Sequence, residues 1–189
     1  MADIDLISRA RGGDEAAWEA LVSQYQEAIF RLAYLLLGDA QEAEDVAQEA
    51  FIRAFRALDR FDTERFYSMQ PWLLSITTNL AHNRRRSIGR YLAALRRQVQ
   101  MEPKPVVYIG EQTTQQWEAH TLWQAVRRLR PAEQEVVYMR YFLDLSEAEM
   151  ASALGVPSGT VKSRLHRALD RLRNVVDHEF PALREERQT

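Results

Sequence analysis

The carboxy-terminal segment LSEAEMASALGVPSGTVKSRLHRALDRLR constrains the fold more than any other part of the chain. Ser146 is a favourable N-cap, and Glu149 three residues later completes a capping box, so a short helix is predicted to begin there. Gly155 is predicted to end this helix. A longer helix is predicted to begin at Ser158 or Thr160, directly after the turn. Two helices joined by so short a turn are typical of a helix-turn-helix.

The second of these helices is predicted to have an apolar face and a basic face. Apolar residues recur at helical spacing at Val161, Leu165, Ala168 and Leu172. In a helix-turn-helix, the second helix enters the major groove of DNA, where arginine can contact guanine and lysine can neutralise phosphates. The alternative is a helical hairpin that does not bind DNA. The side chains expected to contact DNA are Thr160, Lys162, Ser163, Arg164, His166, Arg167 and Arg171.

The rest of the chain is predicted to be helical as well. Glycine and proline are sparse within the periodic segments, and alternating β-branched residues are nearly absent. Between two helical blocks lies QVQMEPKPVVYIGEQTTQQ, whose prolines, glycine and polar residues are typical of a linker. The predicted fold class is therefore all-α, with two small helical domains joined by a flexible linker. The predicted boundaries are 1–90 for the first domain, 91–115 for the linker, 116–180 for the second domain and 181–189 for a tail.

A helix is predicted from Asp39 or Ala40 to about Leu58, because Gly38 stops the preceding helix. Its small and apolar residues share one inward face: Ala43, Val46, Ala47, Ala50, Ala54 and Leu58. The opposite face carries Asp45, Gln48, Glu49, Ile52 and Arg56. Simple solvation accounts for the charged residues, but an exposed Ile52 among them is what a protein-docking surface needs.

Pro71 suits the first turn of a further helix. Its inward residues are predicted to be Trp72, Leu73, Ile76, Leu80 and Ala81, and its outward residues Ser75, Thr78, Asn79, His82, Arg85 and Arg86. Amide, hydroxyl and guanidinium groups on one exposed face are the donors that phosphates and base edges require. The preceding loop, LDRFDTERFYSMQ, adds aromatic side chains, which single-stranded nucleic acids use as stacking platforms. The alternative is a solvated face whose arginines favour the carboxyl end of the helix dipole.

Charge is segregated along the chain, although the net charge is only −2. Acidic residues outnumber basic ones from Asp14 to Glu64, whereas the stretch from His82 to Gln100 has arginines and no acid. One part of the chain is therefore expected to repel phosphate and another to attract it.

Several classes of protein are excluded by what the sequence lacks. The absence of cysteine excludes disulfides, zinc fingers and thiol catalysis. No apolar run is long enough to cross a bilayer, and the amino terminus lacks the order of a signal peptide, so we expect a cytoplasmic protein without membrane insertion. There is no phosphate-binding glycine loop, no HExxH motif and no nucleophile-base pair. We therefore expect no catalytic residues, no metal, no cofactor and no enzymatic activity.

Three segments resemble a known family in the expected order. AEDVAQEAFIRAFRAL and WLLSITTNLAHNRRR resemble region two of RNA polymerase sigma factors of the sigma-70 family, and the terminal helix-turn-helix resembles region four of the extracytoplasmic-function group. The resemblance implies a subunit that binds core RNA polymerase and promoter DNA, directs initiation from particular promoters, and is held inactive by an anti-sigma factor.

The resemblance also implies residue roles. Polymerase docking would use Asp45, Gln48, Glu49 and Ile52. The minus-ten element would be read by Asn79, His82, Asn83, Arg85 and Arg86, and the loop from Asp59 to Met69 would capture an unstacked base. The helix-turn-helix residues named above would read the minus-thirty-five element, and Val136, Val137 and Tyr141 would partly face the polymerase flap. Many relatives carry Asp where this chain has Asn83, so minus-ten preference is not carried over at that position.

Two other functions compete with this interpretation. An autonomous helix-turn-helix regulator would bind duplex DNA by itself as a dimer, and would need neither a docking helix nor a single-strand platform. A helical adaptor without DNA contact would tolerate charge reversal at Arg164 and Arg167.

Overall fold

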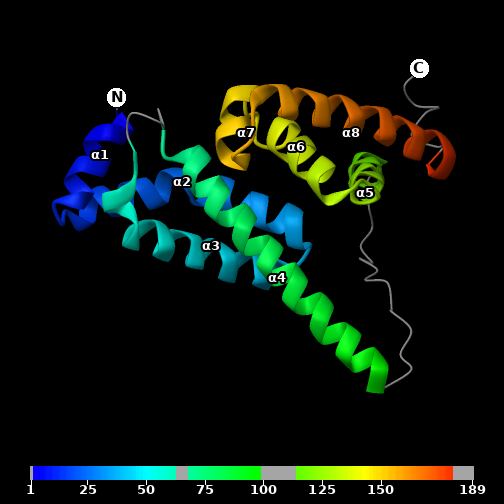
Figure 1. The fold of residues 1–189 in the computed structure, drawn as a ribbon, viewed down its shortest axis with the longest axis horizontal. Helices are drawn as coiled ribbons and strands as arrows, with labels where there is room; N and C mark the ends of the chain where they lie inside the picture. The colour runs from blue at the N-terminus through cyan, green and yellow to red at the C-terminus, as the bar shows by residue number, and fades with distance from the viewer. Residues whose placement is uncertain (1, 63–67, 99–113, 181–189) are drawn as a thin grey trace.

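Every regular element in the described part of the chain is a helix, as predicted. The structure is a computed structural model that describes residues 2–62, 68–98 and 114–180. Figure 1 shows two groups of helices, which we call the amino-terminal module (α1–α4) and the carboxy-terminal module (α5–α8). The elements are α1 (Ala2–Arg11), α2 (Glu15–Leu37), α3 (Ala40–Arg56), the 3-10 turn η1 (Leu58–Arg60), α4 (Gln70–Gln98), α5 (Thr114–Arg127), α6 (Pro131–Tyr141), α7 (Glu147–Leu154) and α8 (Ser158–Glu179).

Local capping signals end α2 and begin α3 and α4 where the sequence predicted. Gly38 closes α2 with a left-handed backbone (φ 77°), which glycine adopts without steric cost. Asp39 caps α3, since its side chain accepts the backbone N–H of Glu42 at 2.9 Å. Pro71 lies in the first turn of α4. This helix continues beyond residue 90, and its far end projects from the body of the molecule.

The helix-turn-helix is confirmed in the same way. Ser146 accepts the backbone N–H of Glu149 at 3.3 Å, and the Glu149 carboxylate accepts the backbone N–H of Ser146 at 2.8 Å. Gly155 ends α7 in a left-handed conformation (φ 64°). Val161 and Ala168 are fully buried, so α8 packs through the face that the sequence predicted.

The amino-terminal module is built on α2, which contacts α1, α3 and α4. The predicted inward face is confirmed, because its five residues in α3 and Leu58, which lies in η1, are all buried. One prediction for α4 is wrong. Thr78 was expected on the outward face but is only 5% exposed, and its hydroxyl donates to the Leu74 carbonyl at 2.8 Å. The reason is that α4 packs against α2, α3 and α7, and three neighbouring helices cover a wider arc of it than one apolar stripe.

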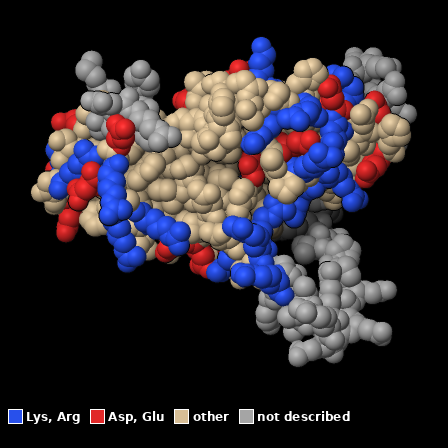
Figure 2. All heavy atoms as spheres, in the orientation of Figure 1, with Lys and Arg blue, Asp and Glu red and all other residues tan. Residues whose placement is uncertain are grey.

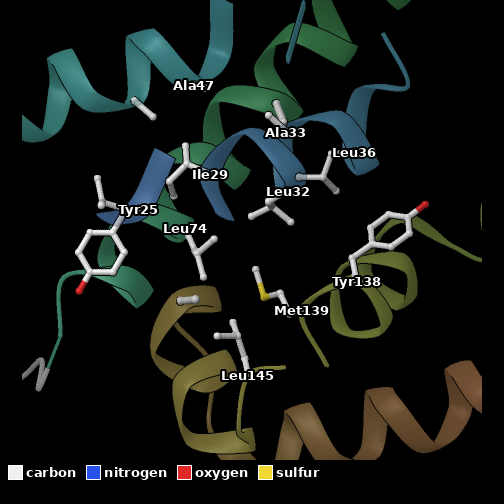
Figure 3. Packing of buried hydrophobic residues seen from close by; sticks show 14 of the residues in the cluster. Tyr25, Ile29, Leu32, Ala33, Leu36, Ala47, Leu74, Tyr138, Met139 and Leu145 are labelled. Carbon is white, nitrogen blue, oxygen red and sulfur yellow. The ribbon is translucent and has the colours of Figure 1, made fainter. Parts of the chain in front are cut away.

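The two modules share one hydrophobic core. Helix α6 packs against α2, and helix α7 packs against α4. We call these contacts together the inter-module interface. In Figure 3 the side chains of Met139 and Leu145 point toward Leu32 and Leu74 of the amino-terminal module. All four are buried, and they belong to a single cluster that extends from α1 to α8. The two modules are therefore held together by buried apolar side chains.

Polar groups also lie at the inter-module interface. Glu135 of α6 is 5% exposed, and its carboxylate lies 2.6 Å from Nε2 of His82 on α4. The hydroxyl of Tyr138 is buried and has no hydrogen-bond partner within the described ranges. Burial raises the pKa of Tyr138 to about 12, while the charges of Arg127 and Arg85 oppose the rise. An ionisable hydroxyl is thus kept neutral and unpaired inside the shared core.

We expect Tyr138→Phe to leave the free energy of unfolding unchanged at pH 7 or to raise it by about 1 kcal/mol, because an unpaired buried hydroxyl is unfavourable. The unfolded tyrosine ionises near pH 10 and the folded one near pH 12, so wild-type stability falls as pH rises through this window. The variant should lose less stability there. Urea unfolding between pH 7 and pH 11 measures both effects.

The matched control is Tyr141→Phe, which changes a 55% exposed tyrosine on the same helix. It should stay within about 0.5 kcal/mol of wild type at pH 7. A loss of more than 1 kcal/mol in Tyr138→Phe alone would mean that the hydroxyl has a favourable partner in the folded protein.

Candidate functional site

The amino-terminal half of α8 presents a basic, exposed face. Lys162 is exposed and Arg164 is half-buried, and neither makes a side-chain hydrogen bond or ion pair with the described residues. Arg167 is exposed and donates its Nε to the Ser163 carbonyl at 3.1 Å, so its guanidinium lies back along the helix. Arginine and lysine at the start of a second helix are suited to base edges and phosphates.

Other predicted residues of α8 have partners within the protein. The Ser163 hydroxyl donates to the Thr160 carbonyl at 3.0 Å, and Nδ1 of His166 lies 2.8 Å from Asp170. Arg171 was expected to neutralise DNA phosphates, but its Nε lies 3.4 Å from the carboxylate of Glu133, which is nearly buried. Its guanidinium links α8 to α6, so Arg171 has a structural contact that sequence spacing did not predict.

The predicted DNA face of α4 borders the carboxy-terminal module. Asn79, Asn83 and Arg86 are exposed, and Arg86 donates to Asn83 at 2.6 Å. His82 is instead engaged by Glu135, and Arg85 is half-buried. One hollow is lined by His82, Arg85, Arg86 and Pro131 of α6. The predicted DNA-binding residues of α4 thus lie together, and α6 lies beside them on the same side of the helix.

Basic side chains lie over the part of α4 whose side chains the structure describes, whereas acidic and basic side chains mix over α1 (Figure 2). Arg84 is an exception within the basic stretch, because it forms ion pairs with Glu42 and, at 3.3 Å, with Asp45 of α3. It therefore fastens α4 to α3. Arg85, Arg86 and Arg90 remain at the surface without an acidic partner in the described part of the chain.

The four residues predicted for protein docking share one side of α3. Asp45, Gln48 and Ile52 are exposed, and Ile52 is 45% exposed. Glu49 is half-buried and pairs at 2.7 Å with Arg53, which lies one helical turn later. The face is acidic and polar with one branched apolar residue, a composition suited to binding a protein and unsuited to binding DNA.

Aromatic residues beside this face were missed by the sequence analysis. Phe55 is 54% exposed with its ring 5.1 Å from Trp18, and Phe30 is 39% exposed. Phe30 and Phe51 line an apolar groove between α2 and α3 that also includes Gln48. The signal was present in AFIRAF, where both phenylalanines lie outside the inward stripe of α3. The groove enlarges the docking face from one helix to two.

The three residues expected to face a polymerase flap differ in their exposure to solvent. Val136 and Val137 are buried, whereas Tyr141 is 55% exposed. In this packed arrangement α6 lies against α2 of the amino-terminal module and against α5, α7 and α8 of its own module, and Tyr141 at its end is accessible.

The loop predicted to capture a base is only partly within the described ranges. Residues 63–67 lie outside them, and nothing is assigned to them. At the two described ends, Phe61 and Met69 are buried, and the ring of Phe61 lies 5.0 Å from that of Trp72. Phe61 and Met69, on either side of the residues outside the described ranges, are therefore both packed in the amino-terminal module.

Among the described residues, no group of three or more His, Asp or Glu side chains is arranged to hold a metal ion. None of the helices in the described ranges combines the length and the apolar character of a membrane span.

Comparison with known proteins identifies both modules. Residues 21–91 match the family model described as Sigma-70 region 2, and residues 119–172 match the model described as Sigma-70, region 4. The fold also resembles a solved structure of CnrH in complex with the cytosolic domain of CnrY. The TM-score is 0.71, the identity is 23%, and the match covers 95% of this chain and 99% of that one.

Full-length relatives agree with these matches. The chain is 35% identical to the ECF RNA polymerase sigma factor SigW of Bacillus subtilis, over 88% of this chain and 92% of the relative. It is 34% identical to the RNA polymerase sigma-H factor of Pseudomonas aeruginosa, over 97% and 96% of the two chains. The chain therefore belongs to the extracytoplasmic-function group of sigma-70 family sigma factors, which direct RNA polymerase to promoters.

Proposed function

We propose that this sigma factor binds core RNA polymerase through the exposed face of α3, reads the minus-ten element with α4 and reads the minus-thirty-five element with α8. The observation that carries the proposal is the exposure of Ile52 within a polar, acidic face beside an apolar groove. Such a face is repelled by DNA and suited to a protein, whereas α4 and α8 present cations. The division of charge supports a subunit that bridges a protein and DNA.

Ile52→Glu tests the docking face. We expect it to weaken binding to core polymerase at least about tenfold, because it places a charge in a surface that polymerase must desolvate. Run-off transcription from a cognate promoter should fall in parallel. The free energy of unfolding should change by no more than about 0.5 kcal/mol, since the side chain is already exposed. Fluorescence titration with core polymerase measures the affinity.

Ile4→Glu is the matched control, because Ile4 is a 47% exposed isoleucine on α1, away from the α3 face. It should bind polymerase as wild type does. Equal losses in both variants would place the docking surface elsewhere. Promoter-duplex binding by the protein alone, with no transcription on adding polymerase, would favour the autonomous regulator. Ile52 is a cleaner target than Asp45, whose replacement would also break the contact with Arg84.

The role proposed for α8 predicts that two substitutions weaken promoter binding in different ways. Arg164→Ala should weaken recognition of particular minus-thirty-five base pairs by about 1–3 kcal/mol, because a guanidinium can contact a guanine edge in a bidentate manner. Lys162→Ala should weaken binding about equally across promoter variants and reduce its salt dependence. Competition between promoter variants for the holoenzyme measures both. The same pattern of loss across variants for the two substitutions would contradict the assignment.

While the modules are packed on each other, α4 and α8 cannot contact both promoter elements at the same time. The two promoter elements are separated by about 25 base pairs, or about 85 Å of duplex at ~3.4 Å per pair. The longest helix of the carboxy-terminal module, α8, has 22 residues and is about 33 Å long. Since His82 on α4 contacts Glu135 within that module, α4 and α8 are too close for a straight duplex. We infer that the modules separate when the holoenzyme forms.

Separation can be measured directly because the chain has no cysteine. Ser23→Cys on α2 and Arg173→Cys on α8 replace exposed residues and provide the only two thiols for a donor and an acceptor dye. We expect energy transfer to be high in the free protein and to fall when core polymerase is added. Transfer that stays unchanged in an active holoenzyme would contradict the inference.

An anti-sigma partner belongs to the same proposal. The sigma factor RpoE of Bartonella quintana, whose fold this chain shares at a TM-score of 0.65, was solved in complex with the anti-sigma factor NepR. The exposed phenylalanines beside α3 offer a surface that such a partner could cover. We further propose that the protein has no catalytic activity of its own and acts in the cytoplasm, where the polymerase initiates.

A further inference from the structure

Helix α8 is held in the carboxy-terminal module by one apolar stripe. Among its residues, all of which the structure describes, only Val161 and Ala168 are buried. They lie seven residues apart and therefore on the same side of the helix. Leu165 and Leu172, on the same stripe, are partly buried. Contacts along one stripe fix where a helix lies, but rotation about its own axis is resisted best by a contact beside the stripe.

Arg171 makes such a contact with α6. It lies roughly 60–80° around the helix from Val161 and Ala168, at about 100° per residue. Its Nε lies 3.4 Å from Oε2 of Glu133, and the side chain of Glu133 is only 10% exposed. The same oxygen accepts the backbone N–H of Arg130, the N-cap residue of α6, at 3.0 Å. The carboxylate that Arg171 contacts is therefore fixed at the start of α6.

Arg171 lies on the side of α8 that carries the arginines assigned to DNA. It follows Arg164 by seven residues and Arg167 by four, so all three side chains leave the helix on one side. This spacing is why the sequence predicted a phosphate contact for Arg171. A rotation of α8 by about 10° would displace a side chain by ~1 Å, because the radius of a helix with its side chains is about 5–6 Å. Since the groups of a binding site have to be held within about 0.5 Å, such a rotation is enough to weaken a base contact of Arg164.

A second ion pair joins α8 to the rest of its module but is much more exposed. Nε of Arg128 on α5 lies 3.1 Å from the carboxylate of Glu179, and the two side chains are 64% and 46% exposed. Exposed ion pairs contribute little, because water and salt screen them and two long side chains must be ordered. Of the two ion pairs, the contact of Arg171 with Glu133 is therefore the one that constrains the rotation of α8.

We propose that Arg171 and Glu133 are positioning residues for recognition of the minus-thirty-five element, whose contact fixes the rotation of α8 and so determines how Arg164 meets a base pair. The role rests on the proposed reading of that element by α8, which its helix-turn-helix geometry and exposed basic face support. Arg171 then acts through α6 and does not neutralise a phosphate. Its loss should therefore reduce discrimination between base pairs and leave the salt dependence of promoter binding unchanged.

The test uses holoenzyme assembled from the full-length chain and core polymerase, with the cognate promoter and single-base-pair variants of its minus-thirty-five element. Changing the base pair that is read most strongly should weaken wild-type binding about tenfold. For Arg171→Ala the same change should weaken binding only about threefold, because Arg164 is no longer held in position. Titrations at several salt concentrations should give the wild-type slope. The ratio of two affinities does not depend on the fraction of folded protein, so a loss of stability alone leaves it unchanged.

Two control variants separate positioning from other effects. Arg128→Ala removes a guanidinium that also pairs with α8, but in an exposed contact, so it should discriminate between base pairs as wild type does. Lys162→Ala removes a proposed phosphate contact, so it should keep the discrimination and reduce the salt slope by about one. Arg171→Ala should resemble neither control.

The outcomes for Arg171→Ala separate the positioning role from the proposed function. Reduced discrimination at the wild-type salt slope supports the positioning role. Undiminished discrimination overturns it, and so does a salt slope reduced by about one, which would mean that Arg171 contacts a phosphate. In both cases reading by α8 stands, provided that wild type distinguishes the promoter variants. If no change in the minus-thirty-five element weakens wild-type binding, reading by α8 fails and the positioning role fails with it, although promoter-dependent transcription would still support a sigma factor.

Glu133→Gln keeps the test decisive if Arg171→Ala does not fold. Its amide oxygen can still accept the Arg130 N–H, so the start of α6 is preserved, but the charge that attracts Arg171 is lost. Glu133 is nearly buried and carries no cation, so a loss of discrimination in this variant does not come from a lost DNA contact. We expect the loss to resemble that of Arg171→Ala, and the double variant to lose no more than either single variant. Wild-type discrimination in Glu133→Gln, or additive losses in the double variant, would overturn the positioning role.

Discussion

The apolar contact between the modules is the constraint on which the rest of the structure depends. Met139 and Leu145 fill the space beside Leu32 and Leu74, and burying side chains of this size contributes about 1.5–3 kcal/mol each. Helices α6 and α7 have only 11 and 8 residues, lengths at which helices need tertiary packing to be stable. The carboxy-terminal module thus takes part of its core from its neighbour, and any state with the modules apart must cover that apolar surface in another way.

Polar groups at the same interface limit its strength. The Glu135 carboxylate and part of the His82 ring are taken from water to form one contact, and the cost of removing polar groups from water offsets much of what their hydrogen bond contributes. The hydroxyl of Tyr138, which has no hydrogen-bond partner in the part of the chain that the structure describes, is a further cost in the same core. An interface with apolar attraction and these polar costs can hold the free chain together and still separate when another surface competes for it, which is what reading two distant promoter elements demands.

Local features could be predicted from the sequence, and long-range ones could not. Ser146, Glu149 and Gly155 act on their own helix ends, so their spacing alone predicted α7 correctly. Thr78 was placed on the wrong face because its burial depends on how α2, α3 and α7 surround α4, which the spacing within α4 does not contain. The contact of Arg171 with Glu133 depends on how α8 crosses α6. The family resemblance supplied the expected roles, but the engagement of His82 by Glu135 needed the packed arrangement.

The position of His82 couples the packing of the two modules on each other to the binding of promoter DNA. It lies on the face of α4 that we assign to the minus-ten element, and its ring contacts Glu135. Pro131 shares a hollow with Arg85 and Arg86, so DNA and α6 would compete for one side of α4. If polymerase binding removes α6 from that side, it increases the affinity for DNA, and by thermodynamic linkage promoter DNA increases the affinity for polymerase by the same factor. Competition between α6 and promoter DNA for this one face of α4 is thus sufficient to make polymerase binding and promoter recognition cooperative.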